Sequence, residues 1–340
     1  MSYYRIAPPP GDTDARRIGV LLVNLGTPAH PAYGAVWRYL REFLSDRRVI
    51  DSPRAFWLPL LYGIVLPLRS GRTAGKYRKV WMPEGSPLAV LSRRLADKLA
   101  SRMASLHGDA VRVELAMTYG RPSIDEVLER MVRDGVRRLL VLPLYPQYCS
   151  STTGSVLDRL GDALRRWRWV PELRFVNDYH AQAPYTTAIA EGIREQWRKT
   201  GRRSHLLLSF HGIPLQYVEQ GDPYRQQCER TAAQVARELS LEEGEFTLCY
   251  QSRFGPVQWL TPYMADSLAA LAARGVREVT VSSPSFAVDC LETLEEIGIQ
   301  YRSAFERTGG RLELVPALND SDAHASVLLS VISPHLAGWL

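Results

Sequence analysis

The sequence predicts an α/β protein made of two similar lobes, each a parallel sheet flanked by helices. Apolar segments of strand length alternate with longer amphipathic segments along the 340-residue chain, the pattern of a parallel sheet with crossover helices. The chain also repeats itself: VLLVNLGTP at 20–28 is similar to LLLSFHGIP at 206–214. In the same way, RDGVRRLLVLPLYP at 133–146 is similar to ARGVREVTVSSPSF at 273–286. This repeat indicates two copies of one α/β unit, joined near residues 170–180.

Composition indicates a folded protein with a sizeable core. Apolar residues make up 46% of the chain and charged residues 23%, the balance of a globular protein. The length fits about two domains of ~150 residues each. The net charge of +6 comes from scattered Lys and Arg and not from a basic stripe with interleaved aromatic residues. It therefore favours anionic partners such as carboxylate-bearing small molecules or an acidic membrane surface.

The elements can be assigned in chain order. Residues 1–17 contain no apolar segment of the signal-peptide or anchor kind, and we expect a loose arm there. The first lobe is expected to span 18–174 and to be completed by a C-terminal helix at 318–340, and the second lobe to span 175–317. Six apolar segments predict the clearest strands: 18–26, 111–120, 137–146, 204–212, 245–252 and 277–286.

The cysteines indicate a reducing compartment. They lie far apart and form no CxxC pair, so neither a zinc site nor a disulfide framework is predicted. The four residues are Cys149, Cys228, Cys249 and Cys290.

One strand ends on a histidine. SHLLLSFHG runs through five apolar or small residues to His211, and a glycine and a proline then end the strand. Ligands of open α/β sheets bind at the carboxyl ends of the strands. A histidine there has a proton affinity near neutrality and a ring nitrogen that binds metals. A hydrogen-bonded structural histidine is the alternative interpretation, and further residues are needed to decide.

The segment AVDCLETLEEI, residues 287–297, follows the equivalent strand of the second repeat pair. Leu291, Leu294 and Ile297 recur at helical spacing and are expected to pack inward, so the segment predicts the first turns of a helix.

Two carboxylates then share one face of that helix. Glu292 and Glu296 are separated by one helical turn, and such a pair in a cleft requires a cation nearby. A structural interpretation is equally open: Asp289 and Glu292 have the spacing of a capping box, and Glu295 with Glu296 is typical of a solvated acidic first turn.

Aromatic side chains are expected at the same edge of the sheets. YQSRFGPVQWLTPY at 250–263 brings Trp259, LPLYPQYCSSTTGS at 142–155 brings Tyr145 with a hydroxyl-rich turn, and Phe286 follows a strand. A cleft with these rings, an imidazole and two carboxylates suits a large flat aromatic ligand with a divalent cation. The chain has no GxGxxG after its first strand and no GxxxxGK[ST], so the nucleotide-binding fingerprints are absent.

Taken together, these motifs closely resemble the ferrochelatase family. The matching segments keep the family's order between residues 18 and 317: VNLGTP, YRKVWMPEGSPL, YPQYCSSTTGS, SFHGIP, YQSRFGPVQWL and DCLETLEEI. The resemblance, to Gram-negative bacterial members, implies a chelatase-like fold of two Rossmann-like lobes with the active-site cleft between them. It also implies the last step of haem biosynthesis, in which Fe2+ enters protoporphyrin IX to form protohaem and two protons are released.

The resemblance further implies roles for individual residues. His211 and Glu292 face each other across the porphyrin as catalytic groups and metal ligands, and Glu296 is the next carboxylate on a helix that leads metal or protons to or from the site. Fe2+ accepts nitrogen and oxygen ligands, and departing pyrrole protons need an acceptor, although which residue deprotonates and which delivers iron stays open. Three aromatic residues match the porphyrin pocket: Tyr145, Trp259 and Phe286.

Departures from the family pattern concern the cysteines. Animal members bear a cysteine-rich C-terminal tail that helps ligate a [2Fe–2S] cluster, whereas this chain has no cysteine after Cys290. Ser150 stands at the position of the remaining cluster cysteine, with Cys149 one residue early. We therefore expect Fe2+ as a substrate and no [2Fe–2S] cluster. Cys290 stands where some members have histidine, which weakens any metal role inferred for that position.

An apolar run bears on membrane contact. AFWLPLLYGIVLPL at 55–68 is followed by basic residues and is too short to span a bilayer. It is interpreted either as a lid over the cleft or as a lip that dips into a membrane to collect a hydrophobic porphyrin. We expect a cytoplasmic monomer, peripheral at the inner face of the membrane.

Other functions stay open at this stage. Coproporphyrin III is the alternative porphyrin, and a cobalt chelatase of the same fold is an alternative enzyme, although such enzymes usually bind metal with more than one histidine. A two-lobed binding protein of the periplasmic type is the third alternative, against which the expected lack of a signal peptide argues.

Overall fold

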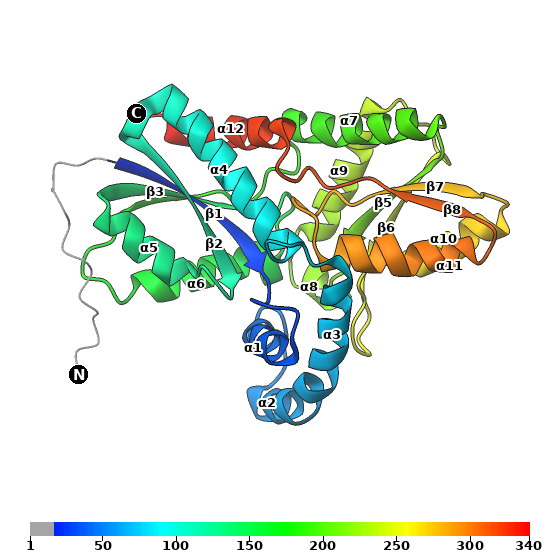
Figure 1. Ribbon diagram of the computed structural model, residues 1–340, viewed down its shortest axis with the longest axis horizontal. Helices are drawn as coiled ribbons and strands as arrows, with labels where there is room; N and C mark the ends of the chain where they lie inside the picture. The colour runs from blue at the N-terminus through cyan, green and yellow to red at the C-terminus, as the bar shows by residue number, and fades with distance from the viewer. Residues whose placement is uncertain (1–16) are drawn as a thin grey trace. The chain divides into compact units, whose positions relative to one another are not determined.

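The computed structural model describes residues 17–340 (Figure 1). The arm expected at 1–17 therefore lies outside the described residues, except for Arg17, which begins strand β1. The chain divides into two compact units. Within the described residues, unit 1 comprises the chain up to Leu144, Ser150–Asp178 and Leu328–Leu340, and unit 2 comprises Tyr145–Cys149 and Tyr179–Val327.

Unit 1 is a four-stranded parallel sheet of order β2-β1-β3-β4. Its strands are β1 (Arg17–Gly26), β2 (Val111–Tyr119), β3 (Val136–Pro143) and β4 (Glu172–Phe175). Its helical elements are α1 (Tyr33–Leu44), α2 (Arg54–Leu60), η1 (Leu61–Val65), α3 (Leu66–Val80), α4 (Pro87–His107), η2 (Gly108–Ala110), α5 (Ile124–Arg133), η3 (Ser150–Gly154) and α6 (Ser155–Leu164).

Unit 2 repeats this topology in a parallel sheet of order β6-β5-β7-β8. Its strands are β5 (His205–His211), β6 (Phe246–Gln251), β7 (Glu278–Ser282) and β8 (Arg311–Leu314). Its helical elements are α7 (Ala183–Thr200), α8 (Leu215–Glu219), α9 (Tyr224–Glu238), α10 (Met264–Ala273), η4 (Glu292–Tyr301) and α11 (Arg302–Glu306). Helix α12 (Asp322–Leu336) begins in unit 2 and ends in unit 1.

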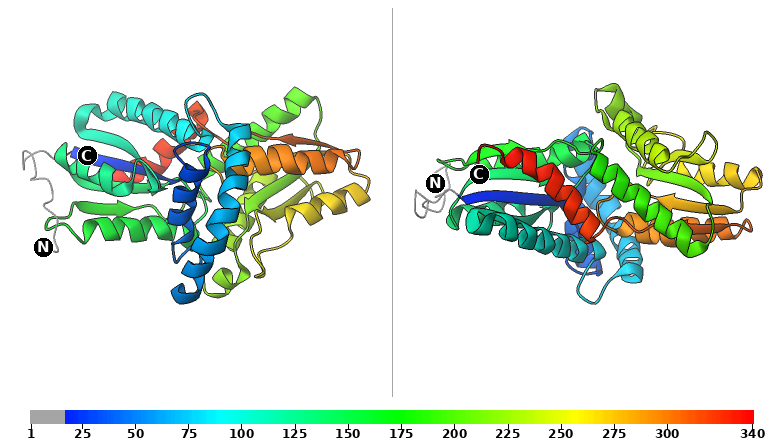
Figure 2. Two further views of the ribbon diagram at one scale, coloured as in Figure 1. Left: turned by 60° about the horizontal axis from the view of Figure 1, so that its bottom comes forward. Right: turned by 90° about the horizontal axis from the view of Figure 1, so that it is seen from above.

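Both faces of each sheet are covered, which explains the continuous apolar strands. Figures 1 and 2 show α5 and α6 on one face of the first sheet with α4 on the other, and α7 and α9 on one face of the second sheet with α10 and α11 on the other. Strands buried on both faces lose the alternation of polar and apolar residues. Accordingly, Ile18–Val23 and Leu206–Phe210 are buried throughout.

The predicted α/β class and internal repeat are confirmed, because both sheets are parallel and have the same strand order. All six predicted strands are present, with small shifts at their ends. The largest shift is at β7, which ends at Ser282 and is followed by a turn in which the Phe286 amide donates to the Ser283 carbonyl (3.1 Å). Two short edge strands, β4 and β8, were not predicted. In the part of the chain that the structure describes, no helix is both long and apolar enough to cross a bilayer.

Candidate functional site

The site is centred on His211, at the carboxyl end of the central strand β5 of unit 2. The backbone amide of His211 donates to Ser285 Oγ (3.2 Å), which ties the strand end to the loop after β7. The ring Nδ1 lies 2.6 Å from the Gly212 carbonyl oxygen. Since a carbonyl oxygen only accepts, Nδ1 carries a proton, and in the neutral ring Nε2 is the acceptor. The half-buried His211 thus presents Nε2 for a proton or a metal ion.

Two predicted pocket aromatics flank this ring. The ring centroid of His211 is 6.5 Å from that of Trp259 and 6.3 Å from that of Phe286. Trp259 is held in place because its loop pairs with the residues after β5: the Leu215 amide donates to the Gln258 carbonyl (2.9 Å) and the Leu260 amide to the Ile213 carbonyl (3.0 Å). Both rings thus lie beside His211, and their assignment to a porphyrin pocket stays a prediction.

Gly212 makes this close packing possible. A Cβ atom at this position would lie 2.9 Å from the Gln251 carbonyl oxygen and 3.1 Å from the Trp259 ring. Both separations are shorter than ordinary carbon contacts, so any larger residue must displace the neighbouring strand end or the indole. The glycine of the Gly-x-Pro sequence is therefore explained by packing against Gln251 and Trp259.

Glu296 is held by a residue that the sequence analysis did not single out. The Ser252 amide donates to Glu296 Oε1 (3.0 Å) and the Ser252 hydroxyl to Oε2 (2.5 Å). Ser252 adopts φ +66°, in the left-handed region that non-glycine residues rarely occupy. Such strain costs on the order of 1–3 kcal/mol and is concentrated at functional sites. Here it accompanies a conformation in which both donors of Ser252 bind one carboxylate.

The pKa of the Glu296 carboxyl depends on its burial and on nearby charges. Burial raises the pKa of the Glu296 carboxyl above its ordinary value, and the negative charge of Glu292 raises it further. The hydrogen bonds from Ser252 and a positive charge on His211 lower the pKa of Glu296. The pKa of Glu296 therefore responds to the charge state of both other residues.

Glu292 begins a π-helix instead of the expected α-helix. The π segment η4 extends over Glu292–Tyr301, and the backbone carbonyl of Glu292 accepts from Gln251 Nε2 (3.2 Å). Short π segments are rare and occur frequently at functional sites. Burial raises the pKa of the neighbouring Cys290 thiol, and the Glu292 carboxylate raises it further, so Cys290 remains a neutral thiol and a poor metal ligand.

The structural alternative for this segment is wrong on two points, and the expected inward packing is met in full only by Ile297. The capping box is not formed, since the Asp289 carboxylate accepts from Thr293 Oγ1 (2.8 Å) and does not cap η4. Glu295 is not solvated: it is 1% exposed and is hydrogen-bonded to Gln300. Of the three apolar residues expected to pack inward, Ile297 is fully buried, whereas Leu291 and Leu294 are half-buried. The wider π geometry changes which residues share the buried face.

The remaining predicted pocket residue, Tyr145, is half-buried in unit 2. Its segment is fixed to α9, because the Tyr148 amide donates to Gln227 Oε1 (2.6 Å) and Gln147 Nε2 to Thr231 Oγ1 (3.0 Å). Among residues 17–340, no group of three or more His, Cys, Asp or Glu side chains is arranged to hold a metal ion.

Comparisons with known proteins show which family this chain is similar to. The family model of ferrochelatase matches residues 17–336. A ferrochelatase from Thioalkalivibrio sulfidiphilus is 48% identical over 335 residues, covering 97% of this chain and 91% of that protein. A ferrochelatase from Methylococcus capsulatus is 48% identical over 324 residues, covering 95% and 98%.

Solved structures show the same fold at low identity. SirB from Bacillus subtilis with Fe3+ superposes with a TM-score of 0.57 at 10% identity, covering 95% of this chain and 96% of that one. CbiX, described as the terminal enzyme for siroheme biosynthesis in denitrifying bacteria, has a TM-score of 0.51 at 14% identity, covering 94% and 100%. These similarities support the two-lobed chelatase fold.

Proposed function

The chain belongs to the ferrochelatase family, which inserts ferrous iron into porphyrin for haem synthesis, and on that premise we propose that its substrate is protoporphyrin IX. Each turnover then consumes one Fe2+ and one porphyrin and yields protohaem and two protons. The observation that best supports this chemistry is the position of His211 at the carboxyl end of β5, with Nδ1 bound to the Gly212 carbonyl and the rings of Trp259 and Phe286 beside it. The choice of protoporphyrin IX rests on the resemblance to Gram-negative members.

His211 and Glu292 are the residues we assign to the reacting centre. With Nδ1–H committed to the Gly212 carbonyl, Nε2 of His211 accepts a pyrrole proton or binds iron. Fe2+ binds both imidazole nitrogen and carboxylate oxygen, so Glu292 supplies a second ligand. In this proposal the pyrrole nitrogens of the porphyrin are the further ligands of the iron.

We assign Glu296 to transport: it carries protons or metal ions to or from the reacting centre. Its buried carboxyl has a raised pKa, which brings its protonation closer to neutral pH and suits a group that takes up and releases protons during turnover. The macrocycle is proposed to lie against Trp259, Phe286 and Tyr145, whose rings supply apolar contact area.

Anaerobic mixing with porphyrin and Fe2+ tests the proposal. Appearance of the haem spectrum with protoporphyrin IX, at a higher kcat/KM than with coproporphyrin III, is expected. A preference for coproporphyrin III refutes the proposed substrate, and faster insertion of Co2+ than Fe2+ points to a cobalt chelatase. Porphyrin binding without any metal insertion leaves a binding protein as the surviving interpretation.

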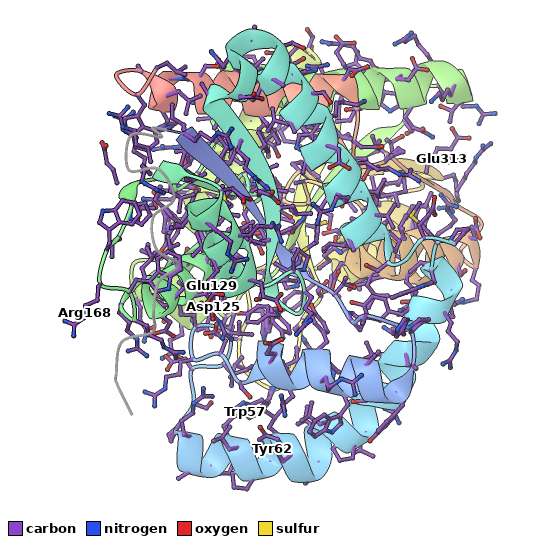
Figure 3. The ribbon with its side chains drawn as sticks, turned by 60° about the vertical axis from the view of Figure 1, so that its left-hand side comes forward. Trp57, Tyr62, Asp125, Glu129, Arg168 and Glu313 are labelled. Atoms are coloured by element: carbon purple, nitrogen blue, oxygen red, sulfur yellow. The ribbon has the colours of Figure 1, made fainter. Side chains whose placement is uncertain are left out.

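The apolar run at 55–68 is proposed to contact a membrane. It forms α2, η1 and the start of α3, with Pro59 and Pro67 on either side of the π segment. Its inward residues, such as Leu61, are buried, whereas four large apolar side chains are exposed: Phe56 (69%), Tyr62 (46%), Ile64 (53%) and Leu68 (62%). Figure 3 shows Trp57 and Tyr62 on this segment. Exposed apolar residues beside basic ones are typical of an interfacial helix.

A variant with Phe56→Asp and Leu68→Asp tests this contact, because both side chains are exposed and the fold should survive. Binding to anionic vesicles is expected to fall while turnover on detergent-solubilised porphyrin is retained. Equal losses in both assays favour the lid interpretation. Arg72→Gln is the control for a purely electrostatic effect.

In line with this contact, we propose that the protein is peripheral at the cytoplasmic face of the membrane. It is proposed to act as a monomer, because the assigned catalytic residues all lie in one unit.

A further inference from the structure

Asp289 and Asn319 form a reciprocal pair, 30 residues apart in the chain. The Asp289 amide donates to Asn319 Oδ1 (2.7 Å), and Asn319 Nδ2 donates to Asp289 Oδ2 (2.7 Å). The Asn319 amide also donates to the Ala287 carbonyl (3.1 Å). These bonds join the loop after β7 to the loop before α12, and both loops lie in unit 2. Asp289 is 5% exposed, so its buried carboxylate oxygens need these hydrogen-bond donors.

The Asp289 carboxylate also accepts a hydrogen bond from the first turn of η4. Thr293 Oγ1 donates to Asp289 Oδ1 (2.8 Å) and accepts from the Cys290 amide (3.0 Å). The bonded residues therefore lie on both sides of Glu292. A chain fixed three residues before and one residue after Glu292 sets the position of its Cα atom and the direction of its Cα–Cβ bond.

Asn319 is itself fixed from the other side. It adopts φ +48°, a left-handed conformation that asparagine tolerates better than most residues. Its carbonyl oxygen accepts from Nδ1 of His324 (2.6 Å), which is 1% exposed in α12. The amide of His324 donates to Ser321 Oγ (3.1 Å). Asn319 thus links the start of α12 to the loop that precedes Glu292.

We propose that Asn319 is a positioning residue for Glu292: it does not touch the substrate, and it sets the location of that carboxylate by holding Asp289. The inference rests on the proposed role of Glu292 in metal insertion. A displacement of about 1 Å at a catalytic group can cost on the order of 100-fold in rate, so loss of the link is expected to act on turnover. Trp259, a proposed macrocycle contact, lies in the loop after β6, outside this network, and should be unaffected. Phe286 lies next to Ala287, whose carbonyl accepts from the backbone amide of Asn319, and a change of the Asn319 side chain leaves that bond in place.

A double-mutant cycle with Glu292 tests the proposal. Asn319→Gly removes both side-chain hydrogen bonds and suits the left-handed backbone. It is expected to lower kcat about 10-fold to 100-fold, with KM for porphyrin changed less than twofold. In a Glu292→Gln background the same change should cost less than twofold, because the carboxylate it positions is gone. Ser321→Ala is the matched control: it perturbs the start of α12 and is expected to lower Tm without changing kcat.

Other results overturn the inference. Equal losses of kcat in the two backgrounds, or a lowered Tm with unchanged kcat, make Asn319 merely structural. If Glu292→Gln alone retains wild-type turnover, the proposed role of Glu292 fails and the inference fails with it. Should Asn319→Gly not fold, Thr293→Val breaks the link to Asp289 at its other end. It must then show the same loss of kcat and the same dependence on Glu292.

Discussion

Replacing His324 with asparagine is expected to flatten the acid side of the stability profile. His324 is 1% exposed, and its Nδ1–H is bound by the Asn319 carbonyl. Burial lowers the pKa of His324 from 6.5 to about 4, and the hydrogen bond to Asn319 opposes this shift only in part. The folded protein therefore keeps this imidazole neutral at pH values where the unfolded chain protonates it.

The sign and size follow from proton linkage. Below pH 6.5 the unfolded state binds the proton more strongly, so the free energy of unfolding falls as the pH falls toward 4 and levels off below it. The difference in pKa, at about 1.4 kcal/mol per unit, corresponds to a total loss of about 3 kcal/mol. Roughly 1.4 kcal/mol of this is lost by pH 5.5.

Urea denaturation at pH 7.0, 5.5 and 4.5 measures the effect. His324→Asn keeps a donor for the Asn319 carbonyl and leaves a cavity, so it should be less stable than wild type at pH 7 and lose less stability on acidification. The Ser321→Ala control retains the imidazole and should follow the wild-type slope. Parallel profiles for wild type and His324→Asn would refute the reasoning, since the acid sensitivity would then arise elsewhere.

Three further predictions concern the site. His211→Ala should keep the fold and porphyrin binding while turnover falls about 100-fold to 10,000-fold; a lowered Tm with wild-type turnover per folded molecule would contradict the assigned role. Gly212→Ala should lower the free energy of unfolding by about 1–3 kcal/mol and weaken porphyrin binding measured by fluorescence quenching, because the new Cβ displaces Trp259; unchanged affinity would count against the proposed pocket. The purified protein should show no visible absorption from a [2Fe–2S] cluster, and acid-labile sulfide in the preparation would overturn that expectation.

The sequence predicted the residues at strand ends well. A buried parallel strand is a continuous run of apolar or small residues, so its end is visible where that run stops, and in β5 it stops at His211. The edge strands β4 and β8 were not predicted, because four residues with charged members, ELRF and RLEL, carry almost no apolar signal. Their pairing depends on the neighbouring strands β3 and β7.

Long-range contacts account for what the sequence did not predict. Leucine spacing in 291–297 indicates a helix but does not distinguish α from π geometry, which depends on how the segment is anchored at Asp289 and Gln251. Likewise, nothing local marks Ser252 for a left-handed conformation or pairs Asn319 with Asp289. Each of these features arises from residues brought together from distant parts of the chain.

Comparing the two copies of the repeat distinguishes residues needed for packing from residues needed for chemistry at the ends of the central strands β1 and β5. Gly26 and Gly212 are equivalent, and a Cβ at either would meet the carbonyl oxygen of the last residue of the neighbouring strand, at 1.7 Å for Gly26 and 2.9 Å for Gly212. The glycine is therefore required by backbone packing in both units and says little about function. The preceding residue is a leucine in unit 1 and His211 in unit 2. Because the repeat keeps the packing residue and changes its neighbour, the imidazole at His211 is not demanded by the fold, which favours its assignment to the chemistry.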